Sequence, residues 1–118
     1  MAKIAAVQMC STSAVGTNLL TAQFLMTRAV EAGAKLLVLP EHFAFIGNGE
    51  TDLLLIKEHY GHGRIQDFIA AQASDLGVWI VGGTIPIISH DEAKVYSSSI
   101  VWNDKGQQVA RYDKIHLL

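Results

Sequence analysis

The amino-acid sequence predicts an α/β fold built on a mixed sheet. One observation is the run Leu36–Leu39, which is apolar without alternation, as is typical of a strand covered on both faces in a parallel sheet. A second is that segments with the apolar spacing of helices lie before and after this run, so strand and helix alternate as in β-α-β units. A third is a pair of strand-like segments near the end, which predicts an antiparallel hairpin.

The first part of the chain contains two predicted strands and one helix. Residues 3–9 form the first strand, and the helix begins at about Thr17 or Asn18, either of which can accept hydrogen bonds from the first turn. Gly33 ends this helix, because the position after a helix often takes a left-handed conformation that glycine favours. Residues 35–39 form the second strand, and the proline that follows ends its hydrogen-bonded ladder because it lacks an N–H group.

The middle of the chain begins with a loop and then returns to regular structure. Residues 42–63 are expected to be mostly loop, with a short helix over 52–59. A second clear helix begins at about Arg64, where apolar residues recur at helical spacing, and Gly77 closes it. Residues 78–82 then form another buried strand, so the order is strand, helix, strand, helix, strand.

The predicted hairpin completes the chain. Residues 96–102 and 107–112 alternate or carry strand-forming side chains, and the turn Asn103–Gly106 separates them. No repeat, low-complexity segment or linker interrupts the sequence. Residues 1–118 are therefore expected to belong to one domain.

Composition and charge exclude several function classes. Half of the 118 residues are apolar, only 17% are charged and the net charge is -2. Without a basic stripe the chain is not expected to bind nucleic acid, and without a polybasic segment or a long apolar run it is not expected to bind or span a membrane. Cys10 is the one cysteine, so no internal disulfide or CxxC pair exists, and a cytoplasmic location is the default expectation.

Glu41 is the first candidate for chemistry. It follows the second predicted strand, and open α/β sheets bind ligands at the carboxyl ends of their strands. A carboxylate beside an apolar wall there is expected to have a raised pKa, which suits general acid–base work. Position alone leaves another interpretation open, in which Glu41 caps a helix or meets solvent.

The remaining polar candidates are weaker when taken alone. Lys114 follows the hairpin, where a lysine is usually solvated. His59 and His62 are three residues apart, but neighbouring glycines indicate a loop and no third ligand is near in sequence, so no metal site is predicted. His42 either lines a pocket beside the preceding glutamate or packs as a neutral side chain, and His116 is expected to be structural. Both tryptophans are expected in the core.

Four motifs in order resemble the nitrilase superfamily of carbon–nitrogen hydrolases. Ile4–Met9 resembles the first strand of its amidases, and Gly33–Glu41 resembles the second strand with its Pro-Glu end. Gly82–Thr84 resembles the strand end after the second helix, and Tyr112–Leu117 resembles the lysine motif. Each fragment is short, but their order extends over essentially the whole chain.

The resemblance implies a Glu-Lys-Cys triad. Glu41 matches the base that takes the thiol proton, and Lys114 matches the cation that stabilises the oxyanion. The nucleophilic cysteine is expected beyond the lysine motif and therefore outside these residues; Cys10 matches a non-catalytic position and is expected to be a small buried or half-buried thiol. The substrate is then a small linear amide, ω-amide or nitrile, with no cofactor and no metal.

The resemblance also implies the shape of the protein. The family fold is a four-layer α-β-β-α sandwich, of which this chain matches the amino-terminal portion, so an incomplete domain is expected. Within the family the Nit-type amidases are most similar, and family members form homo-oligomers. Exposed sheet edges and apolar faces are expected to make the chain either unstable in isolation or self-associating. The alternative is a non-catalytic nitrilase-like or small-ligand-binding α/β protein, because these residues hold no matching nucleophile.

Overall fold

The chain forms one six-stranded mixed sheet with two long helices. The computed structural model describes residues 3–47 and 50–114, with the side chains of residues 50 and 51 left undescribed. Strands β1, β2 and β3 are parallel; β5 runs antiparallel to β3, β4 and β6. The elements are β1 (Lys3–Ala6), α1 (Val15–Glu31), β2 (Ala34–Val38), a 3-10 helix (Glu50–Leu55), α2 (Arg64–Leu76), β3 (Trp79–Val81), β4 (Ile85–Ile88), β5 (Val95–Trp102) and β6 (Gln108–Asp113).

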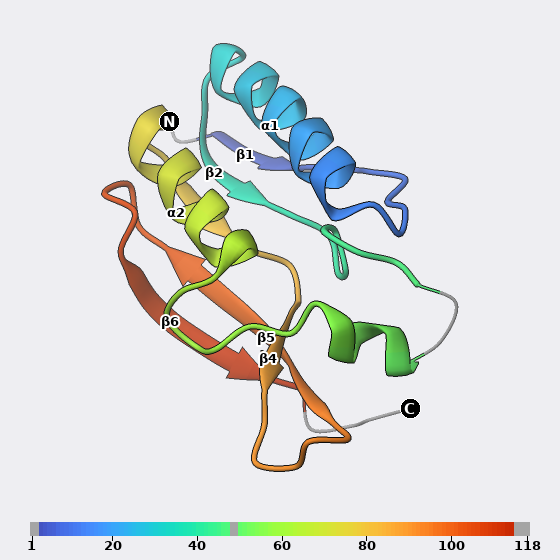
Figure 1. The fold of residues 1–118 in the computed structure, drawn as a ribbon. Coiled ribbons are helices and arrows are strands. Elements are labelled where there is room, and N and C mark those ends of the chain that lie inside the picture. Colours follow the sequence, from blue (N-terminus) through green and yellow to red (C-terminus); the bar gives the residue numbers. More distant parts are fainter. Residues whose placement is uncertain (1–2, 48–49, 115–118) are drawn as a thin grey trace.

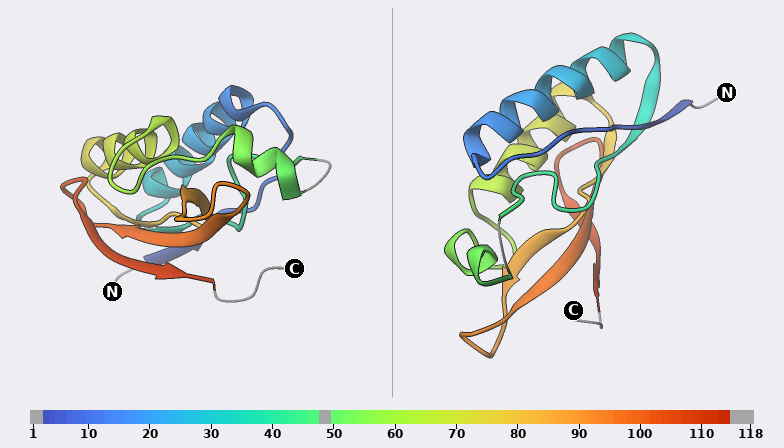
Figure 2. Two further views of the ribbon diagram at one scale, coloured as in Figure 1. Left: turned by 60° about the horizontal axis from the view of Figure 1, so that its bottom comes forward. Right: turned by 90° about the vertical axis from the view of Figure 1, so that its right-hand side faces the viewer.

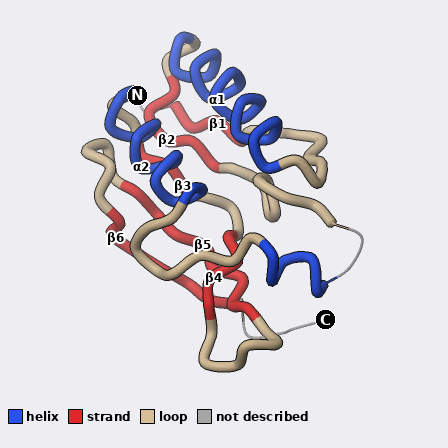
Figure 3. Tube along the Cα trace, viewed as in Figure 1, coloured by secondary structure: helices blue, strands red, loops and turns tan. Residues whose placement is uncertain are grey.

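The two β-α-β units and the hairpin confirm the predicted fold class. α1 connects β1 to β2 and α2 precedes β3, and both helices lie on the same face of the sheet (Figures 1 and 2). The longest strand, β5, pairs with β3 near Val101, with β4 near Ser97 and with β6 along its other edge. The long β4–β5–β6 ribbon extends away from the helices (Figure 3).

The core lies between this helical layer and the sheet. Side chains that are essentially inaccessible come from α1, α2 and the helix-facing residues of β2, β3 and β5: Met26, Leu37, Ile65, Ile69, Ile80, Ile100 and Trp102. Burial of each such side chain stabilises the fold by roughly 1.5–3 kcal/mol. Because the helices and the sheet share this core, their packing holds the ends of the parallel strands in fixed positions relative to one another.

The opposite face of the sheet is also apolar, but no helix within the described ranges covers it. The strand registers place Ala6, Val38, Val81, Val101 and Ala110 in one row across five strands. Alternating residues of a strand point to the same face, so these side chains belong to the face opposite the core. The prediction that the second strand is covered on both faces is therefore wrong for the described residues, which cover one face only.

Trp79 shows the same difference. It was expected in the core, but it lies on the uncovered face next to Leu36 and is 42% exposed, whereas Trp102 is fully buried. The apolar run alone could not distinguish these positions. Which face is covered depends on what packs against the sheet.

The start of α1 and the strand β4 differ from the sequence prediction, whereas Gly33 follows the end of α1 with a positive φ, as expected. α1 begins at Val15 without a side-chain cap, and Asn18 lies within the helix, where its buried amide donates to the carbonyl oxygens of Thr12 and Ala44. β4 was missed because it contains Pro86, which cannot donate to the β5 ladder. No membrane-crossing segment occurs among the helices of the described ranges, since none combines the needed length and apolar character.

Candidate active site

Glu41 lies just beyond the carboxyl end of β2, in the middle of the parallel part of the sheet. The β2–β3 ladder extends to Leu39, whose N–H donates to the carbonyl of Val81 at 2.9 Å. Pro40 then ends the ladder, and residues 41–44 form a turn. The Glu41 side chain is 60% exposed at this edge. This is the edge at which ligands bind in open α/β sheets.

The residues after β3 hold this turn in place. Gly83 has a φ of +63°, and a Cβ atom there would lie 2.1 Å from the carbonyl oxygen of Pro40, so only glycine fits. Thr84 is buried, and its Oγ1 accepts a hydrogen bond of 2.9 Å from the backbone N–H of His42. His42 itself has a φ of +53°, a conformation that costs about 1–3 kcal/mol unless its surroundings hold it. The Gly-Gly-Thr motif therefore shapes the backbone on both sides of Glu41.

Lys114 reaches the same place from the other end of the chain. Its backbone N–H donates to the carbonyl of Ser97 at 3.0 Å, which continues the β5–β6 ladder one residue past β6. Its Nζ lies 2.5 Å from Oε1 of Glu41. The Lys114 side chain is 41% exposed. The fold thus brings the two sequence-predicted site residues together as an ion pair.

The pKa of Glu41 is lowered, not raised as expected from the sequence. The hydrogen bond from Lys114 is the largest cause; burial opposes it, and the charges of Lys114 and His42 add to it. The expectation of an apolar wall was wrong because this side chain is exposed and faces an ammonium group. Since both side chains are well exposed, the pair contributes about 0–1 kcal/mol to stability. Its consequence is chemical: Glu41 is a carboxylate at neutral pH and can accept a proton.

A cavity of about 330 Å³ lies beside Lys114, within the size range of small-molecule pockets. Its walls come from the β4–β5 loop, the start of β5 and the end of β6: Ser89, His90, Asp91, Lys94, Val95, Tyr96, Asp113 and Lys114. None of the first seven was predicted from the sequence. No sequence pattern pointed to them, because the β5–β6 register that brings the start of β5 beside the lysine motif is seen only in the structure.

The other candidates lie apart from this pair or remain undescribed. The rings of His59 and His62 are 6.2 Å apart, and within residues 3–47 and 50–114 no group of three His, Cys, Asp or Glu side chains is arranged to hold a metal ion. Cys10 is a free, exposed thiol beyond the carboxyl end of β1, so the expectation of a buried or half-buried thiol was wrong. His42 is half-buried, and its backbone, as described above, is bound to Thr84. His116 lies outside the described residues.

Comparison with known proteins places this geometry in a family. The sequence profile of the carbon-nitrogen hydrolase family matches residues 3–118. The chain belongs to the carbon–nitrogen hydrolase family. The predicted resemblance to the nitrilase superfamily is therefore confirmed.

Individual relatives of this carbon–nitrogen hydrolase chain agree with the family assignment. It is 36% identical over 114 residues to the deaminated glutathione amidase of Synechocystis sp., covering 96% of this chain and 41% of that protein. It is 32% identical over 117 residues to the omega-amidase NIT2 of Danio rerio, covering 98% of this chain and 40% of the relative. The crystal structure of Saccharomyces cerevisiae Nit3, a member of branch 10 of the nitrilase superfamily, superposes with a TM-score of 0.85 at 27% identity, covering 98% of this chain and 44% of Nit3. The chain thus spans about two fifths of the length of these relatives.

Proposed function

We propose that the protein carrying this chain hydrolyses the carbon–nitrogen bond of a small linear amide, an ω-amide or a nitrile. The observation that supports this most is the ion pair between Lys114 and Glu41 at the carboxyl edge of the parallel strands. The amidase names of the relatives favour an amide over a nitrile, and an ω-amide or deaminated glutathione as the substrate. No cofactor takes part in this proposal, and it assumes a cytoplasmic homo-oligomer.

In the proposed mechanism Glu41 is the general base. Its lowered pKa keeps it ionised at neutral pH, so it can take the proton of a cysteine thiol as the sulfur attacks the carbonyl carbon. The Lys114 ammonium stabilises the oxyanion that forms on the carbonyl oxygen. As the carbon–nitrogen bond of the tetrahedral intermediate breaks, the nitrogen takes up the proton from Glu41 and leaves as ammonia, and water then cleaves the remaining thioester to a carboxylate and free thiol.

The nucleophile in this proposal is a cysteine that follows the lysine motif in the intact protein. Cys10 is not proposed for this role, because the family motifs match it to a non-catalytic position. Residues 1–118 alone are therefore expected to hold two members of the triad and to release no ammonia. Thiol-dependent ammonia release by these residues that survives Cys10→Ala would contradict this assignment of the triad.

Lys114→Met tests the role of the lysine in a polypeptide that also supplies the cysteine. Loss of one group that stabilises an oxyanion lowers kcat by about 100-fold to 1,000-fold. The matched control is Lys105→Met in the exposed β5–β6 turn, which is expected to leave ammonia release unchanged. Equal rates for the two variants would refute the proposed role of Lys114.

The second candidate function is non-catalytic binding of a small ligand. The cavity beside Lys114 favours it, since the cavity is formed entirely by described residues of this chain. The two functions are distinguished by calorimetric titration of residues 1–118 with an amide and with the corresponding carboxylic acid. Tight binding of either ligand, together with no hydrolysis by the intact protein, would favour the binding function.

A further inference from the structure

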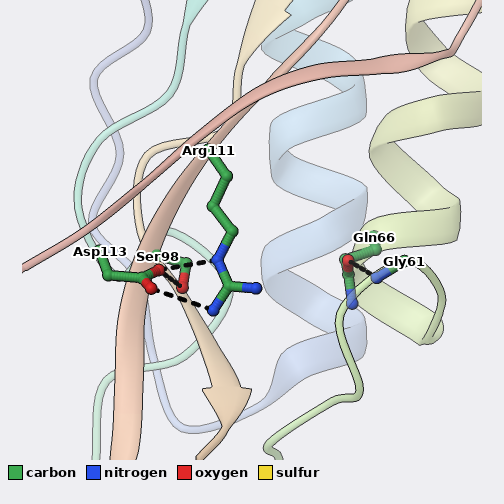
Figure 4. Close-up of polar contacts among 5 residues, drawn as sticks. All are labelled: Gly61, Gln66, Ser98, Arg111 and Asp113. Atoms are coloured by element: carbon green, nitrogen blue, oxygen red, sulfur yellow. Dashed lines mark hydrogen bonds and ion pairs between the residues drawn. The ribbon is translucent and has the colours of Figure 1, made fainter.

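Beside Lys114, at the last residue of β6, a polar network holds the end of the strand. The guanidinium group of Arg111 forms a bidentate contact with the carboxylate of Asp113: Nε donates to Oδ1 at 2.8 Å and Nη2 donates to Oδ2 at 3.2 Å. The hydroxyl of Ser98, a fully buried residue of β5 that lies opposite Asp113 in the ladder, donates to the same Oδ1 at 2.5 Å. Figure 4 shows the three side chains converging.

The arginine in this network is itself held by aromatic rings from two other segments. Its Cζ lies 4.4 Å from the ring centre of Tyr60, in the loop before α2, and 5.6 Å from that of Tyr96 on β5. Such cation–π contacts are worth about 0.5–2 kcal/mol each. The Arg111–Asp113 pair is thus fixed by β5, β6 and the loop before α2 together.

The position of the network matters because β6 is an edge strand. Among the described residues it pairs with β5 alone, and strand ends without further support open locally at little cost in free energy. Lys114 follows directly, tied to β5 by a single backbone hydrogen bond to Ser97. Successive strand residues point to opposite faces, so anchoring Asp113 on one face directs the next side chain away from it.

We propose that Asp113 is a positioning residue for Lys114, acting through the Arg111–Asp113–Ser98 network. This inference rests on the proposed role of Lys114 in the hydrolase site. Asp113 does not touch the substrate in this proposal. It holds the end of β6 so that the lysine Nζ stays within contact of Glu41, and the rigid pair is ready before substrate binds. The lowered pKa of Asp113 agrees with this network. Burial raises this pKa, but the hydrogen bonds from Arg111 and Ser98 lower it, so Asp113 is held as a carboxylate.

The test follows the carboxyl carbon of Glu41 by NMR during a pH titration of the protein. Lys114 lowers the pKa of Glu41, so a displaced lysine lets this pKa rise. Lys114→Met sets the full size of the rise, and Asp113→Asn is expected to produce a large part of it. The sign is informative, because removing the Asp113 charge and freeing the Arg111 charge would by themselves lower the pKa of Glu41.

Asn103→Ala is the matched control at the other end of the same hairpin. The Asn103 side chain accepts from the N–H groups of Lys105 and Gln107, so its loss weakens the β5–β6 hairpin without touching the network. It is expected to lower stability and leave the pKa of Glu41 unchanged. Ser98→Ala, a milder change than Asp113→Asn, keeps the test informative if the asparagine variant fails to fold, and it is expected to raise the pKa of Glu41 by a smaller amount.

A Glu41 pKa that stays at the wild-type value, or falls, in folded Asp113→Asn and Ser98→Ala would overturn the positioning role and leave the network a purely structural device. The measurement needs no turnover. If Lys114→Met abolishes hydrolysis but Asp113→Asn does not move the pKa of Glu41, the proposed function stands and the positioning role fails. If the pKa of Glu41 shifts as expected but the intact protein shows no hydrolysis, the positioning of Lys114 by Asp113 stands and the proposed function fails.

Discussion

At the scale of single residues, the Glu41–Lys114 ion pair sets the charge of the candidate site. The place of Glu41 after a buried strand made it a candidate, because strand ends position ligand sites in open α/β sheets, and the family resemblance supplied its proposed role. The fall in its pKa could not be predicted, since it depends on Lys114, whose approach needs the whole β5–β6 hairpin. Gly83 differs in this respect, because the Gly-Gly-Thr motif is visible in the sequence and the structure gives it a steric cause, the close approach of the Pro40 carbonyl.

The pH dependence of stability should report the Glu41–Lys114 pair. A carboxyl whose pKa is lowered in the folded state stabilises the fold above its ordinary pKa of 4.5, and this contribution is lost as the pH falls through the lower, folded-state value. The stability lost in Lys114→Met relative to wild type is therefore expected to be small at pH 7 and to vanish in strong acid. Denaturant titrations of both proteins at pH 7 and pH 2.5 measure it; a difference that grows in acid would contradict the assignment.

Gly83→Ala should destabilise the protein more than Gly77→Ala does. Both glycines have nearly the same left-handed φ, +63° and +66°, so both substitutions carry the same backbone cost of about 1–2 kcal/mol. Only at Gly83 does the new methyl group also meet the Pro40 carbonyl, which adds about 1–3 kcal/mol of overpacking. Thermal unfolding of the two variants provides the comparison. Equal losses would mean that the turn at Glu41 can move freely to accept the methyl group.

At the scale of elements, the helices and the parallel strands could be predicted because the sequence patterns that indicate them are local. Gly77 takes the left-handed conformation that its place after α2 indicates, and proline ends β2. The start of α2 at Arg64 also agrees with the prediction, but the sequence did not reveal its cap, because its first N–H groups are capped from a distance. Buried Glu58 accepts from the N–H groups of Ile65 at 2.6 Å and Gln66 at 3.1 Å, although it precedes them by seven and eight residues. Such remote capping leaves no short sequence pattern.

Glu58→Ala should therefore lower the free energy of unfolding by more than the sequence alone suggests for a glutamate in a loop. It removes the cap of α2 and leaves buried N–H groups without an acceptor, at about 1–3 kcal/mol. The control is Asp67→Ala in the same first turn, where the side chain only accepts a long bond of 3.4 Å from Gly63, and less than about 1 kcal/mol is expected. Chemical denaturation compares them, and equal small losses would show that the capping by Glu58 is unimportant.

At the scale of the molecule, the described residues form two layers, helices on one face of a sheet. The other face carries the apolar row from Ala6 to Ala110 together with exposed Trp79 and Tyr112. The sequence showed the uninterrupted apolar run Leu36–Leu39 at β2 but could not show what covers the second face of that strand. The relatives are more than twice as long, so in them further residues are available to pack there.

Residues 1–118 by themselves should self-associate through this open face. A contiguous apolar sheet face is a recognised interaction surface. Trp79→Ser is expected to shift the sedimentation coefficient towards that of the monomer. Phe24→Ser removes a comparably exposed aromatic side chain (59% against 42%) from the outer side of α1 and is expected to leave association unchanged. A monomer in the wild type, or an equal effect of both substitutions, would contradict this use of the open face.

The central claim, that Glu41 acts as the base of a carbon–nitrogen hydrolase, is tested most directly by kcat/KM for ammonia release from a small ω-amide. The polypeptide must include the cysteine, and wild type is compared with Glu41→Gln and with Glu92→Gln, an exposed acid on the β4–β5 loop. Loss of a general base is expected to lower kcat/KM by about 100-fold to 10,000-fold in Glu41→Gln, with Glu92→Gln near wild type. A Glu41→Gln variant that keeps wild-type kcat/KM would contradict the account.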